Sequence, residues 1–148
     1  MTGIRIEEVT DVSSDLMEAL TRLIPQLSSS WTGISEEELF NVVHDEAICL
    51  LVARDANERI IGTLSLATFS IPTGTRSWIE DVVVDEAARG LGAAKALVAA
   101  ALNQAAALGA KTVDLTSRPN REAANALYLA MGFTERVTNV YRFALAED

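Results

Sequence analysis

The stretch VVVDEAARGLGAA, from Val82 to Ala94, decides the fold of this chain. Its three valines predict a buried strand, and its small residues open a long alanine-rich helix from Gly92 to Leu108. A helix N-terminus exposes unpaired N–H groups and carries a partial positive charge. Small residues leave that backbone accessible, and Arg89 adds a forked cation. We interpret the stretch as a strand–loop–helix unit that can bind an anion such as a diphosphate.

Three other interpretations of this stretch differ in the spacing that they need. A plain strand-to-helix turn needs glycine for its geometry alone, and the stretch taken by itself leaves that alternative open. A dinucleotide fingerprint requires three glycines at wider spacing, and the third is missing here. A P-loop requires Gly-Lys followed by Ser or Thr, whereas Lys95 is followed by Ala96.

The rest of the chain alternates between strand-like and helix-like segments. Ser35 and Glu38 form a capping box, and Gly109 and Gly132 each end a helix. In order, the predicted elements are a strand at Ile4–Val9, a helix through Ile24, a helix from Ser35 to Val43, strands at Ala47–Arg54, Ile60–Phe69 and Ser77–Val84, the helix Gly92–Leu108, a strand at Thr112–Ser117, a helix at Glu122–Met131, and strands at Phe133–Glu135 and Asn139–Ala144. This order predicts a mixed α/β fold with helices on both faces of a sheet.

Composition narrows the class of protein. A chain of 148 residues, 49% of them hydrophobic, predicts one globular domain over residues 1–148. No apolar run is long enough for a membrane span, no secretory signal is visible, and the single cysteine agrees with a cytoplasmic location. A formal charge of −9 argues against a nucleic-acid partner. No cluster of Cys and His has metal-ligand spacing, so we expect no metal.

Two motifs resemble those of the GNAT superfamily of N-acetyltransferases. Arg89–Ala94 is similar to the family's acetyl-CoA motif, Arg/Gln-x-x-Gly-x-Gly/Ala, and Ala124–Phe133 is similar to its Ala-x-x-Leu-Tyr-x-x-x-Gly-Phe motif. Two motifs in this order and at this spacing are more specific than either alone. The resemblance covers residues 76–145 well, and the first half matches by element order. It implies a GNAT fold, with a mixed and mostly antiparallel sheet of six to seven strands flanked by about four helices.

The resemblance also implies how acetyl-CoA is held. In this family the strand before the phosphate loop and the next strand splay apart, and the pantetheine arm pairs with backbone in the gap like an added strand. An apolar core strand is the competing interpretation of the valines, and both can hold. The family often has Asn where Arg121 stands, which leaves Asn120 and Asn125 as alternatives. The implied cofactor-binding residues are Val82, Val83, Val84, Arg89, Gly90, Leu91, Gly92, Ala93, Ala94, Asn120, Arg121, Asn125 and Tyr128.

Attack of an amine on a thioester needs a base. A lysine-like amine with a pKa of about 10.4 is neutral in only about one molecule in 2,500 at pH 7. Glu80 and Asp81 begin the strand that would carry the thioester, and strand alternation predicts that they point to opposite faces. We favour Glu80, because Ile79–Val82 resembles the corresponding stretch of glucosamine-6-phosphate N-acetyltransferases. The alternative is a solvated pair of carboxylates.

The leaving thiolate and the acceptor need partners as well. The resemblance places Tyr128 beside the thioester sulfur. Because phenol is a weaker acid than a thiol, full proton transfer is uphill by roughly 2 kcal/mol, and a hydrogen bond is the larger effect. The alternative is a tyrosine packed on the sheet. Trp31 is expected either to line the acceptor pocket or to serve ordinary packing, and an amide near Val82 or Val83 can bind the oxyanion.

The leading hypothesis is direct acetyl transfer from acetyl-CoA to a primary amine in a ternary complex. The acceptor is expected to be a small molecule or a peptide, and a homodimer is compatible with the family. A non-catalytic acyl-CoA sensor on the same fold is the alternative, and it needs neither Glu80 nor Tyr128. A toxin that acetylates aminoacyl-tRNA fits the negative charge poorly. Cys49 lies within an apolar run, which favours a buried inert thiol over an acetyl carrier.

Overall fold

The computed structural model describes residues 3–146. These residues form two units, and the boundary along the chain lies between Leu115 and Thr116. We describe each unit by itself. The expectation of a single domain over the whole chain stays a prediction.

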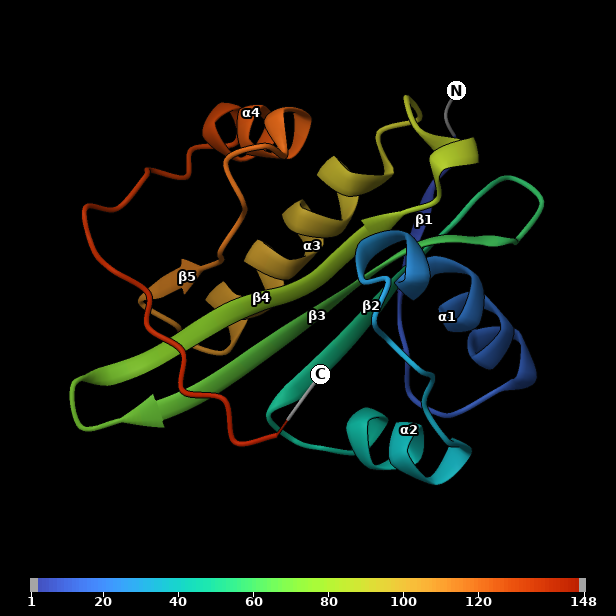
Figure 1. The fold of residues 1–148 in the computed structure, drawn as a ribbon, viewed down its shortest axis with the longest axis horizontal. Coiled ribbons are helices and arrows are strands. Elements are labelled where there is room, and N and C mark those ends of the chain that lie inside the picture. The colour runs from blue at the N-terminus through green and yellow to red at the C-terminus, as the bar shows by residue number, and fades with distance from the viewer. Residues whose placement is uncertain (1–2, 147–148) are drawn as a thin grey trace. The chain divides into compact units, whose positions relative to one another are not determined.

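A five-stranded sheet forms the centre of the first unit (Figure 1). Its order follows the chain, from β1 to β5, and the first three pairings are antiparallel whereas β4 and β5 are parallel. The predicted mixed sheet is therefore confirmed, with five strands in place of six to seven. The strands are β1 (Arg5–Glu8), β2 (Ile48–Arg54), β3 (Ile60–Ile71), β4 (Gly74–Val84) and β5 (Thr112–Asp114).

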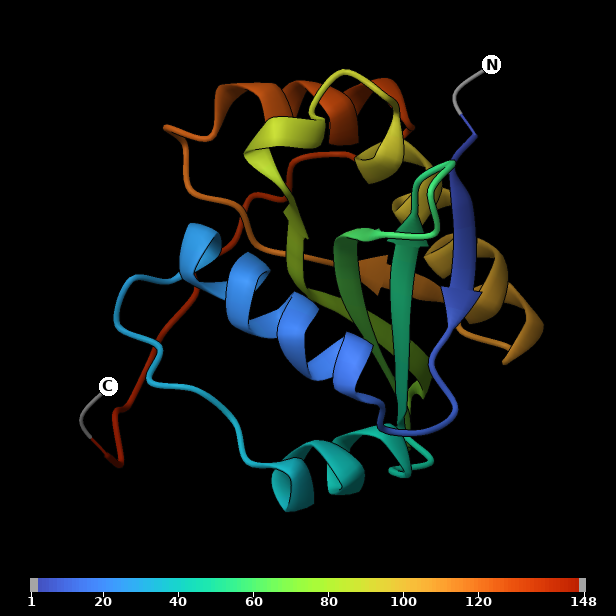
Figure 2. The same cartoon turned by 90° about the vertical axis from the view of Figure 1, so that its right-hand side faces the viewer.

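Helices cover both faces of this sheet, as expected (Figure 2). They are α1 (Ser14–Leu27), α2 (Glu36–Val43) and α3 (Ala93–Ala107), with a short 3₁₀ turn, η1 (Glu86–Ala88), between β4 and α3. Val52 and Val83 belong to the core that α1 and α2 share with the sheet. Gly62 lies on the other face, because a Cβ built there would stand 3.1 Å from Leu97 of α3.

Local signals set the helix ends. The Ser13 side chain accepts from the Leu16 amide at the start of α1, and the capping box of Ser35 and Glu38 is present at α2. Gly109, with φ of +82°, ends α3, and the Ala110 amide then donates to the Ala105 carbonyl.

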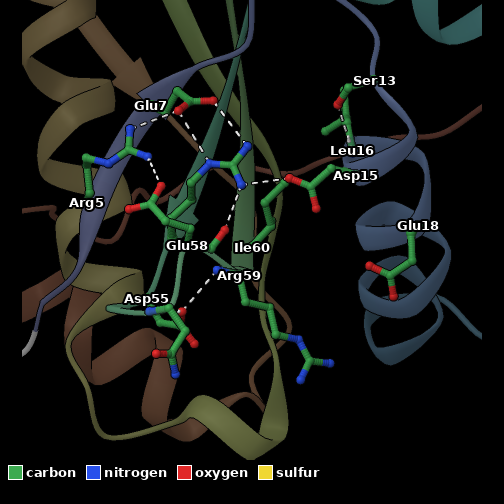
Figure 3. A network of polar contacts seen from close by, with 12 residues as sticks. Arg5, Glu7, Ser13, Asp15, Leu16, Glu18, Asp55, Glu58, Arg59 and Ile60 are labelled. Carbon is green, nitrogen blue, oxygen red and sulfur yellow. Dashed lines mark hydrogen bonds and ion pairs between the residues drawn. The ribbon is translucent and has the colours of Figure 1, made fainter.

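An ion-pair network holds β1 to β2 and α1 (Figure 3). Arg54 is its centre, since its Nη1 lies 2.7 Å from Asp15 Oδ2 and its Nε lies 3.4 Å from Glu7 Oε2. Arg5 contacts the same Glu7 carboxylate at 2.9 Å. These pairs tie the edge strand β1 to the rest of the first unit.

The second unit contains one helix, α4 (Glu122–Ala130), among the residues that the structure describes. Gly132, with φ of +104°, ends it as predicted. The Phe133 amide donates to the Tyr128 carbonyl at 3.0 Å and the Gly132 amide donates to the Leu129 carbonyl at 3.1 Å, which together form a Schellman motif.

The strands predicted at 133–135 and 139–144 are wrong for this structure. Between Phe133 and Ala144 the described backbone joins no sheet, and the side chains of Tyr141 and Phe143 are each 87% exposed. Alternating apolar residues are compatible with a β-strand, but a strand is stable only where another strand is available for hydrogen-bonded pairing. The predicted strand at 112–117 likewise ends at Asp114, where its pairing with β4 ends.

Candidate active site

The site is built on one continuous stretch of the first unit, from the middle of β4 to the first turn of α3. A β-bulge interrupts β4 in its C-terminal half: Glu80 pairs with Ser65 and Val83 pairs with Thr63, so two residues of β4 stand opposite one residue of β3. Asp81 takes φ of +53° at this bulge, which a non-glycine residue rarely adopts. Such strain is often kept where a strand must present its backbone or side chains to a ligand.

The bulge changes the expected arrangement of the two carboxylates. Strand alternation predicts Glu80 and Asp81 on opposite faces, but the register shift breaks the alternation at Asp81. Ser65, the partner of Glu80, also pairs with Leu50 of the α1 core, so Glu80 lies on the α1 face of the sheet. Both carboxylates are exposed to solvent, where water can carry a proton to either.

One edge of β4 is open from Ile79 onward. The parallel pairing with β5 covers only Arg76–Trp78, so in the described part of the first unit residues 79–84 pair with no strand on that edge. Their other edge is bonded to β3. The Val83 side chain packs in the α1 core and is only 6% exposed. Its backbone groups face β3, because Val83 pairs with Thr63 two residues from the Asp85–Ile61 pair, in which the Asp85 amide donates to the Ile61 carbonyl. The neighbouring valines, Val82 and Val84, therefore turn backbone groups to the open edge, where an extended ligand can pair with them.

The loop after β4 presents a bare helix start. Gly92 is the N-cap of α3, and no side chain caps that end. The amides of residues 90–94 donate no hydrogen bond to another described residue. Gly90 and Gly92 have φ of +86° and +82°, and a Cβ built on either would meet nothing within 4 Å. Open space, unpaired amides and the exposed Arg89 fit an anionic group.

The remaining residues of this loop differ in how far they are exposed. Leu91 is 39% exposed, whereas Ala93 is 2% exposed. The Ala93 methyl group therefore packs inside the unit, and only its amide is available to a ligand. Ala94 is half-buried.

The predicted site residues of the second unit lie on or beside α4. Arg121 is the N-cap residue of α4 and is exposed, as is Asn120. Asn125 donates from Nδ2 to the carbonyls of Arg118 and Arg121, at 2.9 and 2.8 Å. Its nitrogen therefore holds the loop before α4, and only its oxygen is left for a ligand.

Tyr128 stands on α4 with its ring edge-on to Phe133 at a centroid distance of 5.7 Å. Burial raises the pKa of Tyr128 above its ordinary value of 10.0, and the positive charge of Arg121 opposes this rise. The phenol is therefore protonated at neutral pH and can donate a hydrogen bond.

Trp31 belongs to the loop between α1 and α2, where it is half-buried. The two roles considered for it both remain predictions. No group of three or more His, Cys, Asp or Glu side chains that could hold a metal occurs among residues 3–146. None of the helices described in those residues has the length and apolar character that a bilayer crossing requires.

Three residues that support the loop between β4 and α3 were not predicted from the sequence: Arg22, Gln26 and Asp85. Asp85 is buried, and its Oδ1 accepts from the Ala87 amide at 3.1 Å. That hydrogen bond lowers the pKa of Asp85, and Arg22 lowers it further. An Asp before a short helical turn is a capping signal that could have been found. Nothing in the sequence pattern marks Arg22 or Gln26.

Comparison with known proteins identifies the family and the fold. Residues 14–133 match the family model described as "Acetyltransferase (GNAT) family". A search of curated protein sequences finds no match.

Several solved structures share the fold. An acetyltransferase of Trypanosoma brucei is 24% identical, with a TM-score of 0.78 over 96% of this chain and 99% of the other. An aminoglycoside acetyltransferase from an uncultured soil metagenomic sample, in complex with sisomicin, is 17% identical, with a TM-score of 0.85 over 98% and 97%. Glucosamine-6-phosphate N-acetyltransferase from Arabidopsis thaliana is 19% identical, with a TM-score of 0.79 over 95% and 97%. At these identities the likeness shows the fold.

Proposed function

Because the chain belongs to the GNAT family of acetyltransferases, we propose that it transfers an acetyl group from acetyl-CoA to a primary amine. Transfer occurs by direct attack in a ternary complex. One observation carries the proposal: the open edge of β4 leads straight into the uncapped start of α3. An extended arm and a diphosphate, joined in one molecule, match these two features in the same order.

Binding falls to the backbone of the first unit. The amides of Gly90–Ala94 hold the diphosphate, and Arg89 contributes a positive charge. The open edge of β4 pairs with the amide groups of the pantetheine arm as a neighbouring strand would. Once bound, acetyl-CoA supplies an activated thioester, and an amide at the bulge beside Val82 stabilises the charge that develops on its carbonyl oxygen.

Proton transfer falls to side chains. Glu80 or Asp81 removes a proton from the acceptor amine, directly or through water. Tyr128 donates a hydrogen bond to the leaving sulfur. Since burial raises the pKa of Tyr128, full proton transfer to a thiolate becomes less favourable, and hydrogen bonding is the role that its environment supports.

The acceptor is proposed to be an amine on a small molecule or a peptide. Two of the structural neighbours are named for acceptors that carry amines on sugars, an aminoglycoside and glucosamine 6-phosphate. An aminosugar is therefore the first class to include in an acceptor panel, in which release of free thiol reports turnover.

Calorimetry with acetyl-CoA tests the binding step without knowledge of the acceptor. Gly92→Glu places a carboxylate at the helix start, and we expect it to weaken acetyl-CoA binding by at least about tenfold, because charge repulsion replaces attraction. Gly109→Glu is the matched control, since Gly109 has the same φ of +82° and the same open space at the other end of α3.

Equal affinity of the two variants would contradict the proposed diphosphate site. Tight acetyl-CoA binding without turnover of any amine would favour the acyl-CoA sensor.

A further inference from the structure

Helix α1 reaches across to the segment that enters the candidate phosphate loop. Arg22 donates from Nη1 to Asp85 Oδ2 at 2.9 Å and from Nη2 to the Ile60 carbonyl at 2.8 Å. The side chains of Arg22 and Asp85 are 19% and 12% exposed. Arg22 also donates from Nε to Glu18 Oε1 at 3.2 Å. A partly buried ion pair is screened less than a fully exposed one, and the three acceptors together fix the guanidinium plane.

Gln26, one helical turn after Arg22, completes the contact. Its Oε1 accepts from the Glu86 amide at 2.9 Å, and its Nε2 donates to the Arg22 carbonyl at 3.2 Å and lies 3.5 Å from Asp85 Oδ1. The Glu86 amide begins the turn η1, so α1 holds both the residue that caps this turn and its first amide.

The loop that follows makes few contacts of its own. The amides of residues 90–94 donate to no described acceptor, and both loop glycines stand in open space. Asp85 connects this loop to the rest of the unit: its amide donates to the Ile61 carbonyl, and its side chain accepts from Ala87 and Arg22. The direction in which the loop leaves the sheet therefore depends on a contact with α1.

We propose that Arg22 and Gln26 are positioning residues for acetyl-CoA. They hold η1 so that the amides of residues 90–94 point at the diphosphate before it arrives, and neither touches the ligand. The inference rests on the proposed function of the same loop. A protein whose binding-competent loop is populated only in part binds more weakly by that fraction, so loss of either contact weakens acetyl-CoA binding.

The test measures acetyl-CoA affinity by calorimetry on the full chain, at a temperature where every variant is folded. Gln26→Met keeps the side-chain length and removes both polar atoms, and we expect about three- to tenfold weaker binding. Arg22→Met removes charge-assisted bonds, and we expect a loss of about tenfold or more. Arg22→Lys keeps the charge but lacks the fork, so its affinity should lie between that of Arg22→Met and the parent.

Thr21→Ala is the matched control on α1. Thr21 is exposed and its hydroxyl donates only to the Met17 carbonyl within the helix, so its loss should leave affinity within about twofold. Hydrogen exchange provides a second measurement: in Gln26→Met, the amides of Glu86, Ala87 and Ala88, which are hydrogen-bonded in the parent, should exchange faster, while those of α1 keep the parent rates.

The outcomes separate this inference from the proposed function. A parent that binds acetyl-CoA, together with a Gln26→Met variant of equal affinity and unchanged exchange at residues 86–88, would overturn the positioning role and leave the function intact. A lower melting temperature with unchanged affinity would do the same, because it assigns the contact to stability alone. A parent that binds no acetyl-CoA would overturn the proposed function first.

Discussion

Glycine is required at different positions of this chain for different physical reasons. Gly90 and Gly92 stand in open space, so their positive φ, and not a shortage of room, excludes larger residues. Gly62 shows the reverse, since a Cβ there would lie 3.2 Å from the Val83 carbonyl oxygen and 3.1 Å from Leu97. Glycine thus allows a left-handed backbone in the loop before α3 and close packing of α3 on the sheet at Gly62.

Tyr128→Phe tests the residue that we place at the leaving group. We expect kcat to fall by about 100-fold, as for loss of one well-placed hydrogen-bond donor, with little change in acetyl-CoA affinity. Because burial raises the pKa of Tyr128, parent activity should show no loss from tyrosine ionisation until well above neutral pH. Thiol release measured against pH gives both quantities.

Tyr141→Phe is the control for this prediction. It changes the chain's other tyrosine, which is 87% exposed. If both variants turned over at the parent rate, Tyr128 would have no part in the chemistry.

At the scale of elements, the strand β1 depends on carboxylates that are charged. Hydrogen bonds from Arg5 and then from Arg54 lower the pKa of Glu7 below its ordinary 4.5. A carboxyl group with a lowered pKa in the folded state stabilises the protein above its unfolded pKa. That contribution is lost as the pH falls through the folded value.

Glu7→Gln should therefore lower the unfolding free energy by about 0.5–1 kcal/mol at pH 7, a small effect because the pairs are partly exposed. Between pH 7 and about pH 2 the difference should shrink, because protonation of the parent's Glu7 as the pH falls through its lowered pKa ends its ion pairs. Urea unfolding at the two pH values measures this difference in unfolding free energy. Glu46→Gln is the control, because Glu46 is exposed and makes no ion pair with another described residue. A difference that persisted unchanged at low pH would assign the effect to packing.

For the molecule as a whole, ligand binding and folding are linked. Acetyl-CoA that binds only the folded chain, at one hundred times its Kd, should raise the unfolding free energy by about 2.7 kcal/mol. For a chain of this size that corresponds to a rise in Tm of roughly 5–10 °C. Differential scanning fluorimetry with and without acetyl-CoA measures this shift in Tm. Adenosine, which lacks the diphosphate and the pantetheine arm, is the control ligand and should give no comparable shift. No shift at saturating ligand would contradict binding to the folded state.

The sequence by itself determined what depends on neighbours within a few residues. The capping box of Ser35 and Glu38 and the stop of α4 at Gly132 appear where they were predicted, because each rests on hydrogen bonds within one or two turns. The start of α3 at Gly92 also appears where it was predicted, because its positive φ is a property of that one residue. The two motifs that resemble those of the family are equally local, and they led to the candidate phosphate loop and to α4.

Only the tertiary structure decided what depends on distant partners. The bulge at Asp81 arises from the register between β3 and β4, and Arg22 meets Asp85 across 63 positions of sequence. Residues 139–144 have a strand-like pattern, yet no strand forms there in the described structure. The physical reason is the same in each case: a strand register, an ion pair between elements and a sheet edge are properties of two segments, and a pattern read along one segment holds no information about the other.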